Sequence, residues 1–172
     1  MADYHSPTVI APDVPIADMT PLERCLLTHM FGFDVAGDAV YFYAELSIEL
    51  RPFIELKALR QAYAESQGVP SQCLEPVGKL LDRFAVVDET EMVDADLVDE
   101  FEDLPYLRIL QDIVRRSATI NWFTVTTAYT CTAMRVDGFG GRAALVCADR
   151  IFSQSTDAFL ESCFEDAKPE GH

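Results

Sequence analysis

Hydrophobic positions recur at helical spacing in several stretches of the chain. The segment Thr20-Pro21-Leu22-Glu23 predicts a helix start, because Thr20 is a good N-cap, Pro21 suits the first helical position and Glu23 can complete a capping box. Leu22, Leu26 and Met30 continue this helix, which Gly32 is expected to close. The same periodicity predicts helices over 55–66, from Pro76 to Phe84, and after Pro105.

Two further helices are predicted from capping residues. Asp94 is expected to cap a short acidic helix whose Leu97, Val98 and Phe101 face inward. The last helix begins at Ser155 or Thr156. Its apolar residues are expected to face the core; they are Phe159, Leu160, Cys163 and Phe164.

Alternating positions predict strands elsewhere. Residues 39–44 are β-branched and aromatic. In 119–134, one face holds Phe123, Val125, Tyr129 and Cys131, and the other holds Thr124, Thr126, Thr130 and Thr132. Residues 142–149 predict a second strand, and the glycine-rich connection between the two predicts an antiparallel hairpin.

This order of elements predicts an α+β fold, with about five helices packed on a small antiparallel sheet centred on the C-terminal hairpin. Residues 1–19, which contain three prolines and no sustained period, are expected to form an extended N-terminal arm. Residues 20–166 are then a single α+β domain, and 167–172 a flexible tail.

The charge of the chain is strongly negative and unevenly distributed. There are 13 Lys and Arg residues against 29 Asp and Glu, a formal net charge of -16, and residues 1–103 account for -15 of it. Such a surface repels phosphate backbones, which disfavours direct nucleic-acid binding, and attracts basic protein surfaces. No apolar run is long enough to span a bilayer and no signal peptide is recognisable, so we expect a cytoplasmic protein without a membrane partner.

Nine carboxylates and no base lie between Asp88 and Asp103. Several are three or four residues apart, so one helical face is a candidate docking surface for a basic partner. Its residues are Asp94, Asp96, Asp99, Glu100, Glu102 and Asp103. The alternatives are a merely solvated surface or a nucleic-acid mimic. A calcium loop is disfavoured because the run has no glycine.

The segment 131–142 is the most distinctive in the chain. Its glycines and arginines are a candidate anion site, in which backbone amides and guanidinium groups would hold a phosphate or carboxylate. The residues concerned are Arg135, Gly138, Gly140, Gly141 and Arg142. The alternative is a hairpin turn whose glycines take positive φ and whose arginines pair with Asp137 and Asp149.

In the same segment, Cys131-x-x-Met134-Arg135-x-x-x-Phe139-Gly140-Gly141 resembles a signature of short, uncharacterised bacterial proteins, some of them encoded on plasmids. The similarity covers roughly residues 119–160 and also includes Tyr129, Ala148-Asp149 and Ser155-Thr156. The resemblance implies a bacterial origin and no particular chemistry. The resemblance makes Arg135 and the Gly140-Gly141 pair stronger candidates for a functional site than their spacing alone does.

Catalytic and metal-binding patterns are sparse. The five cysteines are scattered without a C-x-x-C pair, which argues against a disulfide framework and structural zinc, and we expect no metal or cofactor. A Cys131–His29 pair oriented by Asp149 is conceivable, but both residues fit ordinary helix or core positions. The 59–84 stretch has the outline of a helix-turn-helix, although Pro76 and its acidic start disfavour DNA reading.

These observations favour a non-catalytic interaction or regulatory protein that docks a basic partner surface, as an inhibitor or a nucleic-acid mimic would. The alternative is a small-anion-binding protein or enzyme that uses Arg135 and the glycine-rich loop. A third possibility is that the acidic half keeps a homo-oligomer in solution.

Overall fold

The computed structural model of the chain describes residues 2–96, 104–135 and 138–167. The helices are α1 (Pro21–Met30), α2 (Leu56–Glu65), α3 (Leu74–Arg83), α4 (Pro105–Arg116) and α5 (Thr156–Asp166), with a short 3-10 helix at Ile16–Asp18. The strands are β1 (Tyr4–His5), β2 (Thr8–Ala11), β3 (Val14–Pro15), β4 (Gly32–Ala36), β5 (Ala39–Ala44), β6 (Phe53–Glu55), β7 (Met92–Asp94), β8 (Trp122–Cys131), β9 (Gly140–Cys147) and β10 (Ile151–Ser155).

The described strands form an eight-stranded antiparallel sheet and a separate pair. The order in the large sheet is β10-β9-β8-β2-β5-β3, with β1 also paired to β8 and β4 to β5. The predicted hairpin is confirmed as the β8–β9 pair, which runs from Trp122↔Cys147 to Tyr129↔Gly140. With five helices beside a mostly antiparallel sheet, the predicted α+β class is confirmed.

The N-terminal segment forms the short strands β1, β2 and β3 and a 3-10 helix at Ile16–Asp18, and its strands belong to the sheet rather than to a separate arm. Strand β2 lies between β8 and β5, with Thr8 opposite Thr127 and Ile10 opposite Val125. Ile10 is 1% exposed, so the first strands contribute directly to the core. The expected tail begins at Ala167, which caps α5, and its remaining residues lie outside the described part of the chain.

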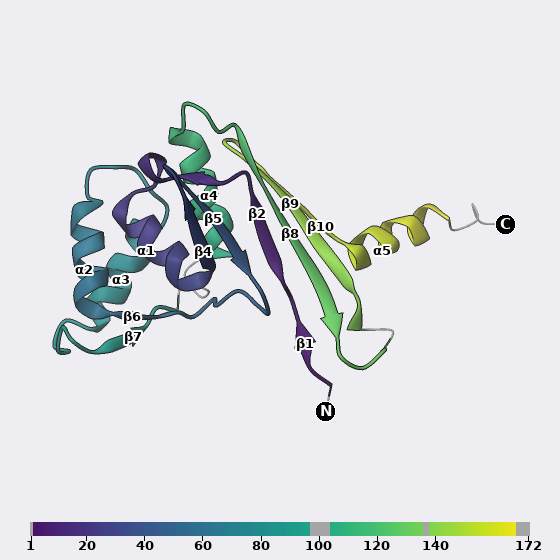
Figure 1. The fold of residues 1–172 in the computed structure, drawn as a ribbon, viewed down its shortest axis with the longest axis horizontal. Coiled ribbons are helices and arrows are strands. Elements are labelled where there is room, and N and C mark those ends of the chain that lie inside the picture. The colour runs from purple at the N-terminus through teal and green to yellow at the C-terminus, as the bar shows by residue number, and fades with distance from the viewer. Residues whose placement is uncertain (1, 97–103, 136–137, 168–172) are drawn as a thin grey trace.

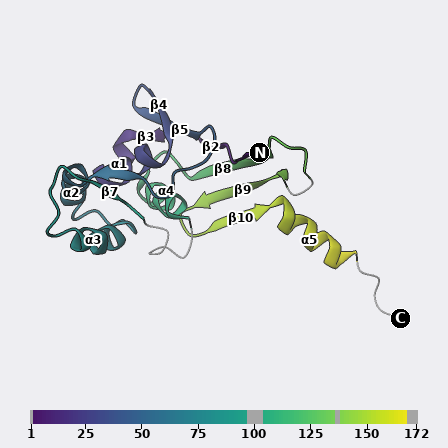
Figure 2. The ribbon, with the colours of Figure 1, turned by 90° about the horizontal axis from the view of Figure 1, so that it is seen from below.

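Alternation along the strands defines the two faces of the sheet. The buried side chains of β8 and β9, among them Phe123, Val125 and Val146, point to the inner face, against which α4 packs. We call the opposite side the outer face. Helices α1, α2 and α3 lie together at one end of the molecule (Figure 1), and Figure 2 shows that α5 projects from the other end.

Helix α1 begins as predicted. Thr20 caps it, and its hydroxyl and the Glu23 carboxylate form the full capping box with the two backbone amides. The helix ends at Met30, and the next residue but one, Gly32, opens β4 instead of closing the helix. Helices α2 and α3 pack as a helical hairpin, and α3 starts at Leu74, with Pro76 inside its first turn.

Two helix predictions are wrong in ways that bear on function. Asp94 does not cap a helix, because it ends strand β7. The predicted inward residues Leu97, Val98 and Phe101 lie outside the described residues. Helix α5 exists and Ser155 caps it, yet none of its residues is buried. Its apolar side does not face the core, because the helix leaves the β10 edge of the sheet and points away from the body (Figures 1 and 2).

Candidate functional site

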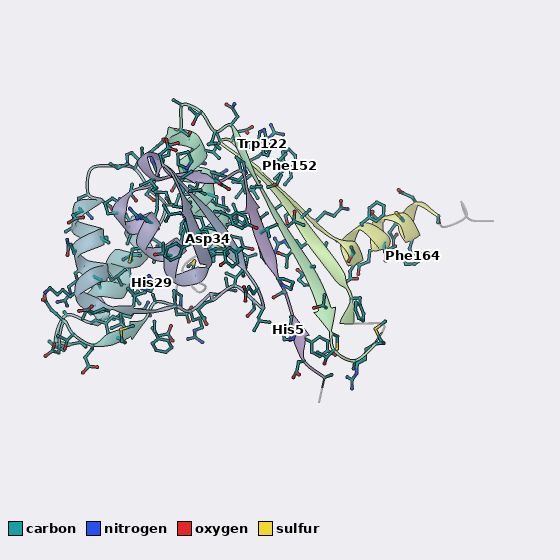
Figure 3. All side chains as sticks on the ribbon, viewed as in Figure 1. His5, His29, Asp34, Trp122, Phe152 and Phe164 are labelled. Atoms are coloured by element: carbon teal, nitrogen blue, oxygen red, sulfur yellow. The ribbon has the colours of Figure 1, made fainter. Side chains whose placement is uncertain are left out.

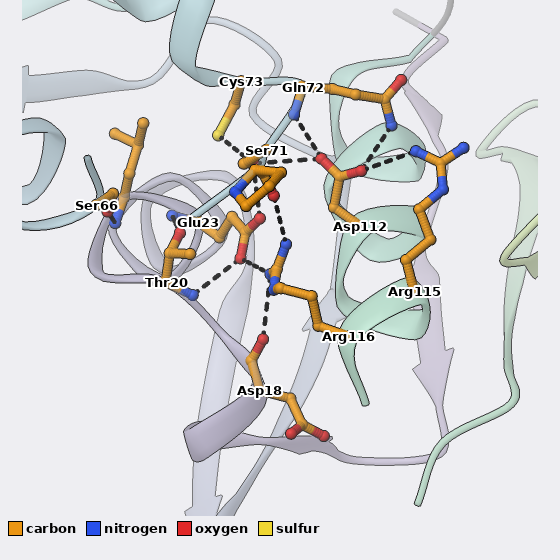
Figure 4. A network of polar contacts seen from close by, with 12 residues as sticks. Asp18, Thr20, Glu23, Ser66, Ser71, Gln72, Cys73, Asp112, Arg115 and Arg116 are labelled. Atoms are coloured by element: carbon orange, nitrogen blue, oxygen red, sulfur yellow. Dashed lines mark hydrogen bonds and ion pairs between the residues drawn. The ribbon is translucent and has the colours of Figure 1, made fainter. Parts of the chain in front are cut away.

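A buried polar network joins α1, α4 and the 66–73 connection (Figure 4). The Glu23 side chain is 0% exposed. Its carboxylate accepts hydrogen bonds from the Thr20 backbone N at 2.9 Å and the Ser71 Oγ at 2.7 Å, and pairs with the Arg116 guanidinium. Arg116 also donates to the carbonyl oxygens of Pro70 and Asp18.

Asp112 is the second carboxylate of the network. It accepts hydrogen bonds from the Gln72 Nε2 at 2.9 Å and from the Arg115 Nη1 at 3.0 Å, as well as from the Gln72 backbone N. Each buried carboxylate therefore has both a cation and neutral donors, as burial of charge requires. A groove of about 480 Å³ passes over Asp112, Arg115 and Arg116.

The thiol in this network is buried. Cys73 is 1% exposed, and its Sγ lies 3.1 Å from the Ser71 Oγ. Burial raises the pKa of Cys73 to about 12, so the reactive thiolate is scarce at neutral pH. The network fixes the three segments relative to one another.

Of the six predicted acidic docking residues, Asp94 and Asp96 lie among the described residues. Asp94 and Asp96 both lie near Arg51, at 3.6 Å and 2.7 Å from its Nη2. Asp99, Glu100, Glu102 and Asp103 lie outside the described residues. Part of the predicted acidic surface is therefore matched by a cation.

The structure places strand β6 beside this acidic segment. Strands β6 and β7 pair antiparallel, with Ile54 opposite Val93 and both buried. This pairing, together with the backbone hydrogen bonds Ala95–Pro52 and Leu56–Glu91, brings residues 51–55 next to residues 88–96. We call these two segments together the acidic β6–β7 surface. Its acidic residues are Glu55, Asp88, Glu89, Glu91, Asp94 and Asp96, and its one basic residue is Arg51.

Two large apolar side chains are exposed within this surface. Phe53 is 61% exposed and Met92 is 55% exposed. Both alternate with the buried Ile54 and Val93, so they share the outward side of the two strands with Glu55 and Asp94. Phe53 and Glu55 were not among the residues that the sequence pattern indicated for this surface. The alternation Phe53-Ile54-Glu55 is a strand signal, but three residues are too few to stand out.

The glycine-rich segment is explained by packing. A Cβ on Gly138 would come 2.5 Å from the Cys131 Cβ, and one on Gly141 would come 2.9 Å from the Thr127 carbonyl oxygen. Neither glycine has positive φ, so the hairpin-turn interpretation was wrong on that point. Asp149 pairs with Arg150 at 3.0 Å rather than with Arg135 or Arg142, and Asp137 lies outside the described residues.

Of the two candidate arginines, Arg142 lines a pocket. Arg135 is exposed, whereas Arg142 is half-buried and donates from its Nε to the Ser153 Oγ at 2.6 Å. The pocket is about 210 Å³ and is lined by Ser6, Thr8, Ile48, Leu50, Leu104, Tyr106, Thr127, Tyr129 and Arg142. Burial raises the pKa of Tyr106 to about 12, an effect that Arg142 opposes and Tyr129 reinforces. Tyr106 comes from the buried side of α4, and its position in the sequence gives no sign of this role.

Large side chains on the outer face of the sheet are exposed, among them Trp122 and Phe152, and α5 extends beyond the β10 edge (Figure 3). A groove of about 570 Å³ follows this face, lined by Thr124, Thr126, Ala143, Ala144, Leu145, Phe152, Ser153, Gln154 and Ala158. On α5, Phe159 is 54% exposed and Phe164 is 67% exposed. The molecule thus shows two apolar surfaces, one on the sheet and one on the helix, without a cover for either among the described residues.

The conceivable catalytic pair lies on separate elements. His29 sits in α1, with its Nδ1 2.7 Å from the Cys25 carbonyl oxygen, and Cys131 is buried at the end of β8 beside Gly138. Within the described ranges, no three His, Cys, Asp or Glu side chains are grouped so that they could hold a metal ion. Among the described helices, none combines the length and the apolar character needed to cross a membrane.

Comparison of the chain with protein-family models, with curated proteins and with solved structures found no match.

Proposed function

We propose that the chain is a non-catalytic interaction protein that docks a basic surface of a partner protein through the acidic β6–β7 surface. The observation that carries this proposal is the β6–β7 pairing, which places the exposed Phe53 and Met92 beside Glu55, Asp94 and the other carboxylates of residues 88–96.

The two kinds of side chain have complementary roles in docking. An excess of carboxylates attracts a basic surface over distances of about 10 Å and speeds encounter. Affinity after encounter depends on apolar groups that leave water, and aromatic residues and methionine are enriched at the centre of such interfaces. Phe53 and Met92 would supply that centre, and the surrounding acids would select a basic partner.

The internal ion pairs reduce the charge of this surface without cancelling it. Arg51 forms ion pairs with both Asp94 and Asp96. The Arg60 Nη1 of α2 lies 3.2 Å from the Glu89 Oε1. The side chains of Glu55 and Glu91 are exposed on the same surface. Reversing the charge of these two residues is therefore the most direct test.

The test compares binding of a fluorescent oligolysine peptide and capture of partners from a bacterial lysate. We expect both to weaken strongly between about 50 mM and about 500 mM NaCl, because exposed charges are screened. We expect E55K/E91K to lose both, and Phe53→Ser to lose the captured protein while keeping most of the peptide binding. The control is D34K/D38K, which changes the net charge equally on the β4–β5 hairpin. Equal losses in E55K/E91K and in this control would contradict docking through the β6–β7 surface.

The pocket at Arg142 favours a second candidate function, binding of a small anion. A guanidinium group beside tyrosine and threonine hydroxyls suits a phosphate or carboxylate, and about 210 Å³ fits only a small molecule. A panel of phosphate and carboxylate metabolites should then include one that raises the melting temperature of the wild-type protein. Arg142→Met should abolish that rise, and Arg135→Met, away from the pocket lining, should retain it. No rise with any anion would reject this function.

A further inference from the structure

Helix α5 is an unusual element of this fold, because an isolated helix of its length is only marginally stable in water. It has 11 residues, none of them buried, and it extends from the end of β10 away from the sheet (Figures 1 and 2). Its apolar side chains Phe159, Leu160 and Phe164 are each about half exposed or more. A helix in this situation gains stability when a second surface covers its apolar side.

The chain itself carries a surface of the right kind. The outer face of the sheet exposes Trp122, Leu145 and Phe152 beside the groove that ends at Ala158 of α5. Leu145 and Phe152 are cross-strand neighbours, so they form one continuous apolar patch on β9 and β10. Helix α5 points away from this patch rather than lying on it (Figure 3).

The position of β10 shows how the two surfaces can meet. Within the described sheet β10 is an edge strand, paired with β9 on one side only. Edge strands offer a row of backbone donors and acceptors to another strand. Because α5 follows β10 directly and leaves from that same edge, a second copy placed against the edge lies in the path of the helix.

We propose that the protein forms a two-fold dimer in which the β10 edges face each other and α5 of each chain packs on the outer face of the other chain's sheet. A two-fold arrangement buries both apolar surfaces of both chains, because each helix meets the other chain's patch. This proposal is independent of docking through the acidic β6–β7 surface.

The charges agree with a second copy as the occupant. The charged residues of α5 are all acidic: Asp157, Glu161, Glu165 and Asp166. Such a helix is repelled by an anionic membrane. On the sheet, Arg150 pairs with Asp149 and lies 5.5 Å from the centre of the Phe152 ring, so it places a cation beside the patch that the acidic helix would approach.

The available area is also adequate. The exposed parts of the six large apolar side chains named above amount to roughly 500 Å² per chain, since a whole aromatic side chain buries about 150–250 Å². With the surrounding polar atoms and the β10 edge, two chains together reach about 1,200 Å², the lower end of specific interfaces.

The test is the mass of the full chain in solution, measured by sedimentation and by light scattering after size exclusion, up to about 100 µM chain. We expect the wild-type protein to have twice the 19.2 kDa mass of one chain at the upper concentrations and to dissociate on dilution. F159D/F164D alters the helix and Phe152→Asp alters the sheet. Both should be monomeric at all concentrations, with an unchanged β-sheet signal in circular dichroism.

The matched control is Phe53→Asp, which introduces the same charge at an equally exposed aromatic residue on the acidic β6–β7 surface. It should leave the dimer intact. A second measurement needs no variant: maleimide should label the exposed Cys163 of α5 more slowly in concentrated than in dilute protein, with sites resolved by peptide mass. A monomeric wild-type protein throughout the concentration range, or a dimer that survives both F159D/F164D and Phe152→Asp, would overturn the proposal.

Discussion

Replacing Glu23 with glutamine tests the idea that the buried network holds α1, α4 and the 66–73 connection together. The substitution keeps the shape of the side chain and removes its charge. Arg116, whose side chain is 22% exposed, then lacks its counterion, and the new amide group faces donors at Thr20 and Ser71. The folded state loses an ion pair, and among the partners of Glu23 the new amide NH2 can donate only to the Ser71 hydroxyl.

The size of the effect follows from what Arg116 retains. Removing one partner of a buried ion pair typically costs about 3–5 kcal/mol. Arg116 keeps hydrogen bonds to the carbonyl oxygens of Pro70 at 3.1 Å and Asp18 at 3.2 Å, and it can still reach water. We therefore expect Glu23→Gln to lower the free energy of unfolding by about 2–4 kcal/mol, a large share of the 5–15 kcal/mol typical of a domain.

Urea unfolding followed by circular dichroism measures this loss. The slope of the free energy of unfolding against urea concentration should stay unchanged, which shows that only the stability has changed. Glu91→Gln, at an exposed carboxylate, is the control and should change stability by less than about 0.5 kcal/mol. The double variant E23Q/R116M should be more stable than the sum of the single losses by at least about 1 kcal/mol, because removing both charges leaves none unpaired. A loss below about 1 kcal/mol for Glu23→Gln, or strict additivity, would refute the account of the network.

Two further predictions concern the sheet and the buried titratable groups. Gly141→Ala should lower stability by about 1–3 kcal/mol in thermal unfolding, because its Cβ would come 2.9 Å from the Thr127 carbonyl oxygen; an unchanged melting temperature would show that this close approach is unimportant. Burial raises the pKa of Cys73 from 9.0 to about 12, and that of Tyr106 from 10.0 to about 12, so above pH 9 the unfolded chain releases protons that the folded chain keeps. Stability should therefore be fully present below pH 9 and fall between pH 9 and 12, by up to about 1.4 kcal/mol per pH unit for each group, and Cys73→Ala should show a shallower fall in urea midpoints measured across this range.

The parts of this fold that were predictable from the sequence are those decided by neighbours in the chain. The capping box needs only Thr20 and Glu23, three residues apart, and it forms as expected. The alternation that starts at Phe123 predicted the buried face of β8 for Phe123, Val125 and Cys131, because strand periodicity depends on no other element. Tyr129, which was predicted on the same face, is 37% exposed. Ser155 likewise caps α5 through the nearby Ala158 amide.

The parts that could not be predicted depend on distant pairing. Strand β2 joins the sheet through Thr8 and Thr127, which are 119 residues apart, and no local pattern selects that partner. The same holds for the acidic β6–β7 surface, where Phe53 meets Asp94 across 41 positions. The pocket at Arg142 needs the packing of α4 to deliver Tyr106. An amphipathic pattern, as in α5, shows that a helix has a side to bury and does not show which molecule covers it.

The two proposed surfaces lie at opposite ends of the molecule, with the acidic β6–β7 surface in the helical end and α5 beyond the far edge of the sheet (Figure 1). A dimer formed through β10 and α5 would therefore leave both acidic surfaces accessible and far apart. Two linked sites bind a partner that presents two basic surfaces, or a repeated one, about 10²–10⁴ times more tightly than one site does, provided the spacing matches. The monomeric F159D/F164D variant separates the two proposals: it should bind a soluble oligolysine peptide as the wild-type protein does, but bind a surface densely coated with that peptide much more weakly. Equal binding of both proteins to the coated surface would mean that dimerisation, where it occurs, adds nothing to docking.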